Sequence, residues 1–134
     1  MTAQDAETVA ATFIRWLETG EPPAGLFTAD AFADVSLPRW RLQAQGADDI
    51  LAIRRTNHPW PGKVTRSRCD PTPAGFVLEL EEQWQQGGEQ WYCRELFRAE
   101  VRDGAIAQLA VYCTGDWDSA RRAEHAREVR LLRP

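Results

Sequence analysis

Several side chains in the second half of this sequence could act as acids, bases or hydrogen-bond donors. The segment WYCRELF (91–97) alternates on a period of two, and Glu95 shares a side with the apolar residues Trp91, Cys93 and Phe97. A carboxylate on an apolar sheet face is costly to bury without a hydrogen-bonding partner, and burial raises its pKa. A carboxyl group with a raised pKa suits general acid or base catalysis near neutral pH. Glu95 is therefore a candidate catalytic residue, and a buried structural carboxylate is the alternative.

Asp116, Tyr112 and His58 join Glu95 as candidate catalytic residues, each with a simpler alternative. Asp116 could act as an acid or base at a pocket mouth, whereas the nearby Asp118 fits the N-cap of a last helix. Tyr112 could donate a hydrogen bond to an oxyanion or to Glu95, or it could be a core tyrosine. His58 lies in a loop, where it could act as a base or simply be exposed. Cys93 borders the same site, but no histidine stands beside it to favour nucleophilic catalysis.

Two hairpin turns fix how these residues face one another. The pairs Gly87-Gly88 and Asp103-Gly104 are typical of two-residue hairpin loops. Opposed residues share a sheet face, so the register predicts one apolar face and one solvated face that carries an apolar strip of Leu109 and Val111. Glu82, near a hairpin end, is expected at a solvated rim. The first turn pairs Trp84 with Trp91 and Leu80 with Glu95, and the second pairs Tyr112 with Glu95 and Asp116 with Trp91.

The remaining elements follow from periodicity and from capping or turn residues. Apolar residues at helical spacing predict a first helix containing Val9, Phe13 and Trp16, which Thr2 or Asp5 could cap and Gly20 ends. The predicted elements after it are a short helix over 26–32, an extended segment over 34–45, a helix over 47–55, strands over 64–70, 76–85, 90–102 and 105–116, and a last helix from Asp118 to about Glu128. At 134 residues the chain is expected to form one domain, 1–134.

The composition excludes several classes of function. A formal charge of −4 lacks the basic footprint of a nucleic-acid-binding protein. No apolar run approaches the ~20 residues that span a bilayer, and the N-terminus lacks the features of a signal peptide. Three cysteines without an export signal indicate reduced thiols in a cytoplasmic protein. With no Cys-x-x-Cys pair and only two histidines, no metal site is expected.

The order of elements resembles the nuclear transport factor 2-like superfamily, which includes SnoaL-like polyketide cyclases and ketosteroid isomerases. The segments that carry the resemblance are LFTADAF (26–32), QGADDI (45–50) and RDGAIAQLAVYCTGDWD (102–118). It implies an α+β domain in which a cone-shaped, curved antiparallel sheet wraps around N-terminal helices, with a short C-terminal helix. The chain departs from the steroid isomerases at VSLP (35–38), where they carry a basic aspartate, and the aspartate–arginine–aspartate arrangement of the superfamily's epoxide hydrolases is not evident.

The resemblance also implies a pocket on the concave face, closed by Phe13 and Trp16. Tryptophans there could line a site for a planar ligand, or they could serve core and interface packing. The full set of residues predicted to line the site is Phe13, Trp16, Trp40, Trp84, Trp91, Cys93 and Phe97.

Three classes of function fit these expectations. The first is an acid/base enzyme, a cyclase, isomerase, dehydratase or hydrolase, that uses no cofactor and acts on a small apolar or aromatic organic molecule. The second is a non-catalytic binding protein with the same pocket, and the third is an interaction domain. Because one fold hosts many functions, only the polar residues of the pocket favour the first class. The apolar strip of Leu109 and Val111 further predicts a homodimer through the outer sheet face.

Overall fold

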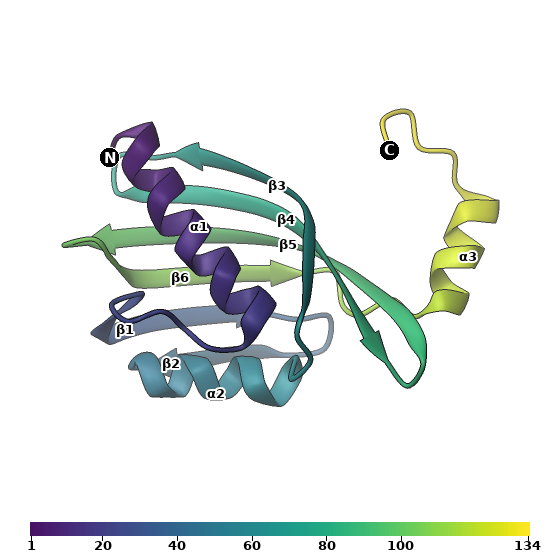
Figure 1. The fold of residues 1–134 in the computed structure, drawn as a ribbon, viewed down its shortest axis with the longest axis horizontal. Coiled ribbons are helices and arrows are strands. Elements are labelled where there is room, and N and C mark those ends of the chain that lie inside the picture. Colours follow the sequence, from purple (N-terminus) through teal and green to yellow (C-terminus); the bar gives the residue numbers. More distant parts are fainter.

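Three helices and one six-stranded sheet make up the computed structural model, which describes residues 1–134 (Figure 1). The strand order is β2-β1-β6-β5-β4-β3, and every neighbouring pair is antiparallel except β1 with β6, which is parallel. None of the helices is long and apolar enough to cross a membrane. The elements are α1 (Ala3–Thr19), β1 (Phe27–Ser36), β2 (Arg41–Gln45), α2 (Ala47–Asn57), β3 (Gly62–Pro71), β4 (Gly75–Gln86), β5 (Glu89–Arg102), β6 (Ala105–Cys113) and α3 (Ser119–Glu128).

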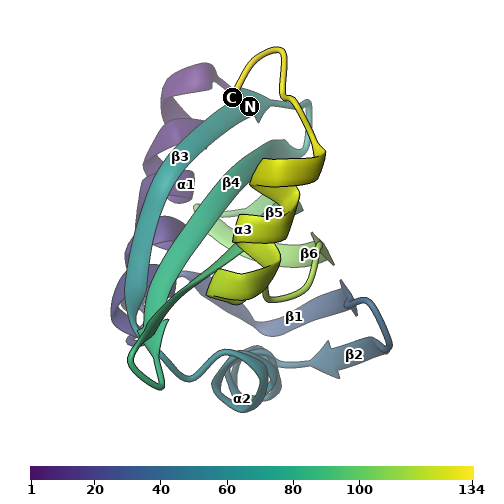
Figure 2. The same ribbon diagram turned by 90° about the vertical axis from the view of Figure 1, so that its right-hand side faces the viewer.

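The sheet is strongly curved and does not close, with β2 and β3 as its two edges (Figure 2). In Figure 1, α1 lies across one face of the sheet and α2 runs beside β2 at one edge, while α3 stands apart near the other end of the molecule. The expected α+β cone is therefore confirmed. The helices that occupy its concave side are α1 and α2.

Helix α1 begins and ends where the sequence predicts. The Thr2 hydroxyl accepts a hydrogen bond from the Asp5 N–H at 3.1 Å, which caps the first turn. Gly20 ends the helix at φ 77°, a left-handed conformation that glycine adopts without strain, and its N–H donates to the Trp16 carbonyl. The buried Phe13 ring packs edge-on against Phe97 of β5, with ring centroids 4.7 Å apart. This contact fixes α1 on the concave face, directly over the strands that carry Glu95.

The helix predicted over 26–32 is wrong, because this segment contributes most of β1. Alternate residues Ala31, Ala33 and Val35 are buried, which is the period of a strand rather than of a helix. β1 pairs in parallel with β6, where Ala33 lies opposite Leu109. The segment predicted as extended over 34–45 holds the end of β1 and all of β2, joined by a turn.

The predicted register between β4 and β5 is confirmed residue by residue, including the pairs Trp84 with Trp91 and Leu80 with Glu95. The predicted register between β5 and β6 holds only at the turn. Val101 pairs with Ile106 but Glu100 pairs with Gln108, so one extra residue in β6 forms a bulge.

The bulge exchanges the two faces of β6 beyond Ala107. Tyr112 therefore pairs with Leu96 on the outer face and is 58% exposed, so its predicted place beside Glu95 is wrong. Leu109 and Val111, predicted as an outer apolar strip, are 4% and 7% exposed and belong to the core. Cys113 takes the position opposite Glu95, and β6 ends there rather than at Asp116.

The last helix begins as predicted, because Asp118 is the N-cap of α3 and accepts from the Arg121 N–H at 2.8 Å. The segment before α3 is held to the sheet by two hydrogen bonds between the backbones of Tyr92 and Trp117. These contacts bring the chain between β6 and α3, which contains Asp116, back over the end of β5.

Candidate functional site

A cavity of about 90 Å³ lies between α1, α2 and the concave faces of β1, β5 and β6. Its wall is mostly apolar, and two of its lining residues, Asn57 and Asp116, are exposed to solvent. The exposed end at Asp116 is called the mouth below. The volume is below the ~150 Å³ of a cavity that binds benzene, so a ligand of that size must extend toward the mouth or widen the walls. The lining residues are Phe13, Trp16, Leu17, Ala33, Val35, Leu37, Ile50, Ile53, Arg54, Asn57, His58, Cys93, Glu95, Phe97, Leu109, Val111, Cys113 and Asp116.

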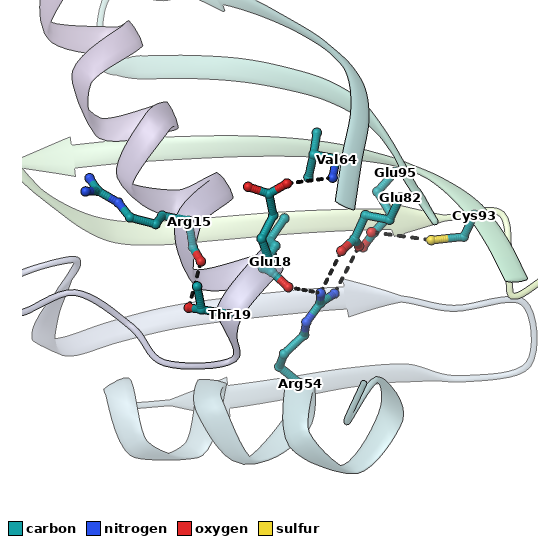
Figure 3. A network of polar contacts seen from close by, with 9 residues as sticks. Arg15, Glu18, Thr19, Arg54, Val64, Glu82, Cys93 and Glu95 are labelled. Atoms are coloured by element: carbon teal, nitrogen blue, oxygen red, sulfur yellow. Dashed lines mark hydrogen bonds and ion pairs between the residues drawn. The ribbon is translucent and has the colours of Figure 1, made fainter. Parts of the chain in front are cut away.

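A buried cluster of Arg54, Glu82 and Glu95 lies at the polar end of this cavity, which Arg54 and Glu95 line and Glu82 does not (Figure 3). Arg54 extends from α2 and binds the Glu82 carboxylate of β4 with both terminal nitrogens, at 2.7 and 3.1 Å. Its Nη2 also donates to the Leu17 carbonyl of α1 at 3.1 Å. One guanidinium therefore links α1, α2 and β4 at the end of the cavity that carries Glu95.

The two carboxyl groups of this cluster hold different charges. Burial, the Glu82 charge and a hydrogen bond to Glu82 raise the pKa of Glu95 well above its ordinary value. Burial also opposes ionisation of Glu82, but hydrogen bonding from Glu95 and the charge of Arg54 outweigh it and lower the pKa of Glu82 to about 2. Glu82 is therefore the group that ionises first and Glu95 the one that keeps its proton to higher pH, in line with the rule that close like charges cannot both ionise.

His58 supplies a second titratable group to the wall. Burial and the nearby charge of Arg54 lower the pKa of His58 from 6.5 to about 4, so the imidazole is neutral at pH 7. Neither ring nitrogen has a hydrogen-bond partner, and the ring packs against Trp84 with centroids 4.2 Å apart. A neutral imidazole with a free nitrogen can accept a proton or a hydrogen bond from a bound molecule.

Two cysteines and Asp116 complete the polar part of the site. The Cys93 thiol donates to Glu95 Oε1 at 3.5 Å, and the sulfur atoms of Cys93 and Cys113 and an Asp116 oxygen all lie within 4.8 Å of one another. The Gly115 N–H donates to Cys113 Sγ at 3.4 Å. Burial, followed by the charge of Glu82, raises the pKa of Asp116.

Such spacing would let one cation contact three of these side chains. Cys93, Cys113 and Asp116 form one such group, and Glu82, Cys93 and Glu95 form another. In the second group Arg54 already neutralises Glu82. The expectation of no metal site stays a prediction.

The structure brings together seven of the eleven side chains that the sequence assigned to a site. They are Phe13, Trp16, His58, Cys93, Glu95, Phe97 and Asp116, and all seven line the cavity. The other four lie elsewhere. Tyr112 is on the outer face, Trp40 is 67% exposed beyond β1, Trp84 is buried behind His58, and the Trp91 indole N–H donates to the Gln86 carbonyl beside the hairpin turn. The pocket is thus less aromatic than predicted.

Arg54 was missed by the sequence reasoning, and Glu82 was placed wrongly. Glu82 is 1% exposed rather than on a solvated rim, because α2 covers this end of the sheet and supplies Arg54. The register itself carried a signal, since it put Glu82 between the inward-facing Leu80 and Trp84. A buried acid predicted on that face required a cation, and Arg54 follows the inward-facing Ile50 by one helical turn.

These observations describe a largely apolar cavity with a polar end in a protein with the fold of the nuclear transport factor 2-like superfamily. No protein-family model and no curated protein sequence matches the chain. Solved structures do. An NTF2-like protein from Anabaena variabilis is 18% identical with a TM-score of 0.68, and the match covers 87% of this chain and 96% of that one.

Two further structures of similar fold have names that refer to enzymes. A ketosteroid isomerase-like protein from Kribbella flavida is 18% identical with a TM-score of 0.62, over 98% of this chain and 92% of that one. An LEH-like epoxide hydrolase from M. tuberculosis is 15% identical with a TM-score of 0.63, over 82% and 83%. At these identities the likeness establishes the fold, and the activity has to be argued from the pocket.

Proposed function

We propose that the protein is an acid/base enzyme acting on a small, largely apolar organic molecule, with Glu95 as proton donor and His58 as proton acceptor. The observation that carries the proposal is the buried Glu95 carboxyl in the wall of an apolar cavity beside Glu82, where burial and the Glu82 charge raise the pKa of Glu95 and favour its protonated form. A carboxylic acid that stays neutral at pH 7 can protonate or hydrogen-bond a developing oxyanion.

The chemistry needs a second group that takes a proton, and neutral His58 in the same wall meets that need. Reactions of this kind remove a proton from carbon or water while an oxygen of the substrate receives one. Isomerisation of an unsaturated ketone and opening of an epoxide by water both belong to this class, and neither needs a cofactor. The mostly apolar wall suits an uncharged substrate.

The Glu82 carboxylate positions the donor rather than touching the substrate, since Glu82 does not line the cavity, whereas its ion-pair partner Arg54 does. The ion pair keeps Glu82 ionised, and the ionised Glu82 in turn holds the proton on Glu95. Like the aspartate–arginine–aspartate arrangement of the superfamily's epoxide hydrolases, this cluster combines one arginine with two carboxyl groups. In this chain the arginine lies on helix α2 and not on a strand.

The direct test is the protonation state of Glu95. Infrared difference spectra between wild type and Glu95→Gln at pH 7 should show the carbonyl band of one neutral carboxylic acid in the wild type. Glu79→Gln is the matched control, because Glu79 lies on the outer side of β4 with a half-exposed side chain. A wild-type spectrum without that band would refute the assignment of Glu95 as the donor.

Turnover is tested with two small probes, cyclopentene oxide and 3-cyclopentenone, followed by diol formation and by the absorbance of the conjugated enone. We expect Glu95→Gln and His58→Gln each to lower turnover about 10²- to 10⁴-fold, and Glu79→Gln to leave it unchanged. Binding of both probes without turnover would favour the non-catalytic binding protein that uses the same pocket.

A further inference from the structure

A pair of thiols in the cavity wall has no part in the proposed acid/base chemistry. Cys93 lies on β5 and Cys113 ends β6, diagonally across from it, because Cys113 pairs with Glu95. Both side chains line the cavity, with their sulfur atoms within 4.8 Å of each other. The third cysteine, Cys69, lies on β3, which β4 separates from β5.

We propose that Cys113 is a site of oxidation by hydroperoxides and that Cys93 resolves it, giving a Cys93–Cys113 disulfide in the pocket wall. Cys113 is half-buried and close to the mouth at Asp116, whereas Cys93 is 1% exposed. A hydroperoxide that enters through the mouth therefore reaches Cys113 first. This inference does not depend on the proposed acid/base function.

The surroundings of Cys113 favour its thiolate. The contact with Cys93 and a hydrogen bond from the Gly115 N–H lower the pKa of Cys113 despite its burial, while the contact with Cys113 and burial raise the pKa of Cys93. Carboxylates oppose ionisation from two sides, since Asp116 and Glu82 both act to raise the pKa of Cys113. Thiolate character, access and a nearby resolving cysteine together mark redox-sensitive cysteines.

The turn after β6 holds this arrangement in place. Gly115 has φ 85°, and a Cβ there would come within 2.7 Å of Pro38 Cγ, so both conformation and space favour glycine. The turn directs the Gly115 N–H onto the Cys113 sulfur and brings Asp116 beside the two thiols.

The reaction balances in two steps. The Cys113 thiolate attacks one oxygen of the hydroperoxide, so an S–O bond forms, the O–O bond breaks, and the alkoxide leaves as an alcohol with a proton. The sulfur is oxidised to a sulfenic acid as the hydroperoxide is reduced. Cys93 then attacks that sulfur, so the S–S bond forms, the S–O bond breaks, and hydroxide leaves as water with the Cys93 proton.

Closing the disulfide requires the end of β6 to move. Diagonal residues in an antiparallel pair have Cα atoms about 7–8 Å apart, slightly beyond the usual range of up to about 6.8 Å for a disulfide. β6 ends at Cys113, so the adjustment falls at the end of the ladder rather than at its centre. Closing the disulfide also removes the Cys93 thiol that donates to Glu95, and it shifts the mouth at Asp116.

The test treats reduced protein with stoichiometric hydrogen peroxide, alkylates the remaining thiols and maps the cysteines by mass spectrometry. We expect the wild type to lose two hydrogen atoms, to link Cys93 with Cys113, to leave Cys69 alkylated, and to recover with dithiothreitol. Cys69→Ser is the matched control and should oxidise like the wild type.

Two variants separate attacking from resolving thiol. Cys93→Ser should accumulate a sulfenic acid on Cys113 that dimedone traps, and Cys113→Ser should lower the rate of oxidation at least about tenfold. The proposal is overturned if the wild type stays fully reduced, if the disulfide involves Cys69, or if dimedone labels no Cys113 in the Cys93→Ser protein. The wild-type experiment decides by itself should either variant fail to fold.

Discussion

Replacing Arg54 with methionine tests the charge arrangement on which the site depends. The change leaves the Glu82 carboxylate, 1% exposed, without its cation, and the Leu17 carbonyl without its donor. Lowering the pKa of Glu82 from 4.5 to about 2 corresponds to about 3 kcal/mol of stabilisation. Breaking a buried ion pair by removing one partner costs about 3–5 kcal/mol. We therefore expect Arg54→Met to lower the free energy of unfolding by about 3–5 kcal/mol at pH 7.

The loss should depend on pH in a defined direction. The pKa of Glu82 is lower in the folded state than in the unfolded state, so its stabilisation is present above about pH 4.5 and disappears as the pH falls toward 2. The difference between wild type and Arg54→Met should therefore shrink below pH 4.5. Urea denaturation followed by tryptophan fluorescence at pH 7, 5 and 4 measures it.

Two further variants make this experiment decisive. Arg55→Met changes the exposed neighbour of Arg54 on the same helix and should cost less than about 0.5 kcal/mol. The double variant Arg54→Met with Glu82→Met removes both charges and should recover most of the loss. Our account of the cluster is refuted if Arg54→Met costs less than about 1 kcal/mol, or if the double variant is no more stable than the single one.

Four further outcomes follow from the structure. Glu95→Gln should be at least as stable as the wild type at pH 8, because the raised pKa of Glu95 costs stability as the pH rises above its ordinary value of 4.5; lower stability in urea would contradict this. Between pH 6.5 and 4 the wild type should lose roughly 3 kcal/mol of stability through His58, because only the unfolded histidine takes up a proton there, and His58→Gln should remove this loss. An unchanged dependence of stability on pH would count against a buried neutral His58. Asp118→Ala should destabilise α3 by about 1 kcal/mol, seen as faster amide exchange in its first turn, and unchanged exchange would exclude the cap. If the outer sheet face pairs two copies, light scattering should show a dimer that Tyr112→Glu converts to a monomer, and a monomeric wild type would end that prediction.

Local turn chemistry made the β4–β5 hairpin predictable. Gly87 and Gly88 both have positive φ, as a two-residue hairpin of this type requires, and once the loop is fixed every pair along the two strands follows. The same reasoning failed for β6 because a bulge needs only one extra residue and leaves no mark in the turn itself. The apolar pattern of β6 does show the bulge. Ile106 has an even number and Leu109 and Val111 have odd numbers, so a strand without a bulge could not bury all three on one face.

The partner of a buried charge was harder to predict than the charge. Glu95 follows from alternation within one strand and Glu82 from the neighbouring strand, so both depend on contacts between segments joined by a short turn. Arg54 reaches them from a helix 28 residues before Glu82, and its position depends on how α2 packs against the sheet. The β1 segment was misassigned for a related reason: it pairs in parallel with β6, more than 70 residues away, and no hairpin turn marks that pairing in the sequence.

The charged side chains of the inner cavity wall nearly neutralise one another. This balance restricts the class of substrate that can bind there more than the fold does. Arg54 offsets Glu82, the raised pKa of Glu95 favours its neutral form, and His58, whose pKa is about 4, is neutral at pH 7. A charged ligand would find no free counter-ion in the inner wall, so burying it there would cost several kcal/mol. An uncharged molecule meets one hydrogen-bond donor, Glu95, and one unpartnered acceptor, His58, among apolar walls.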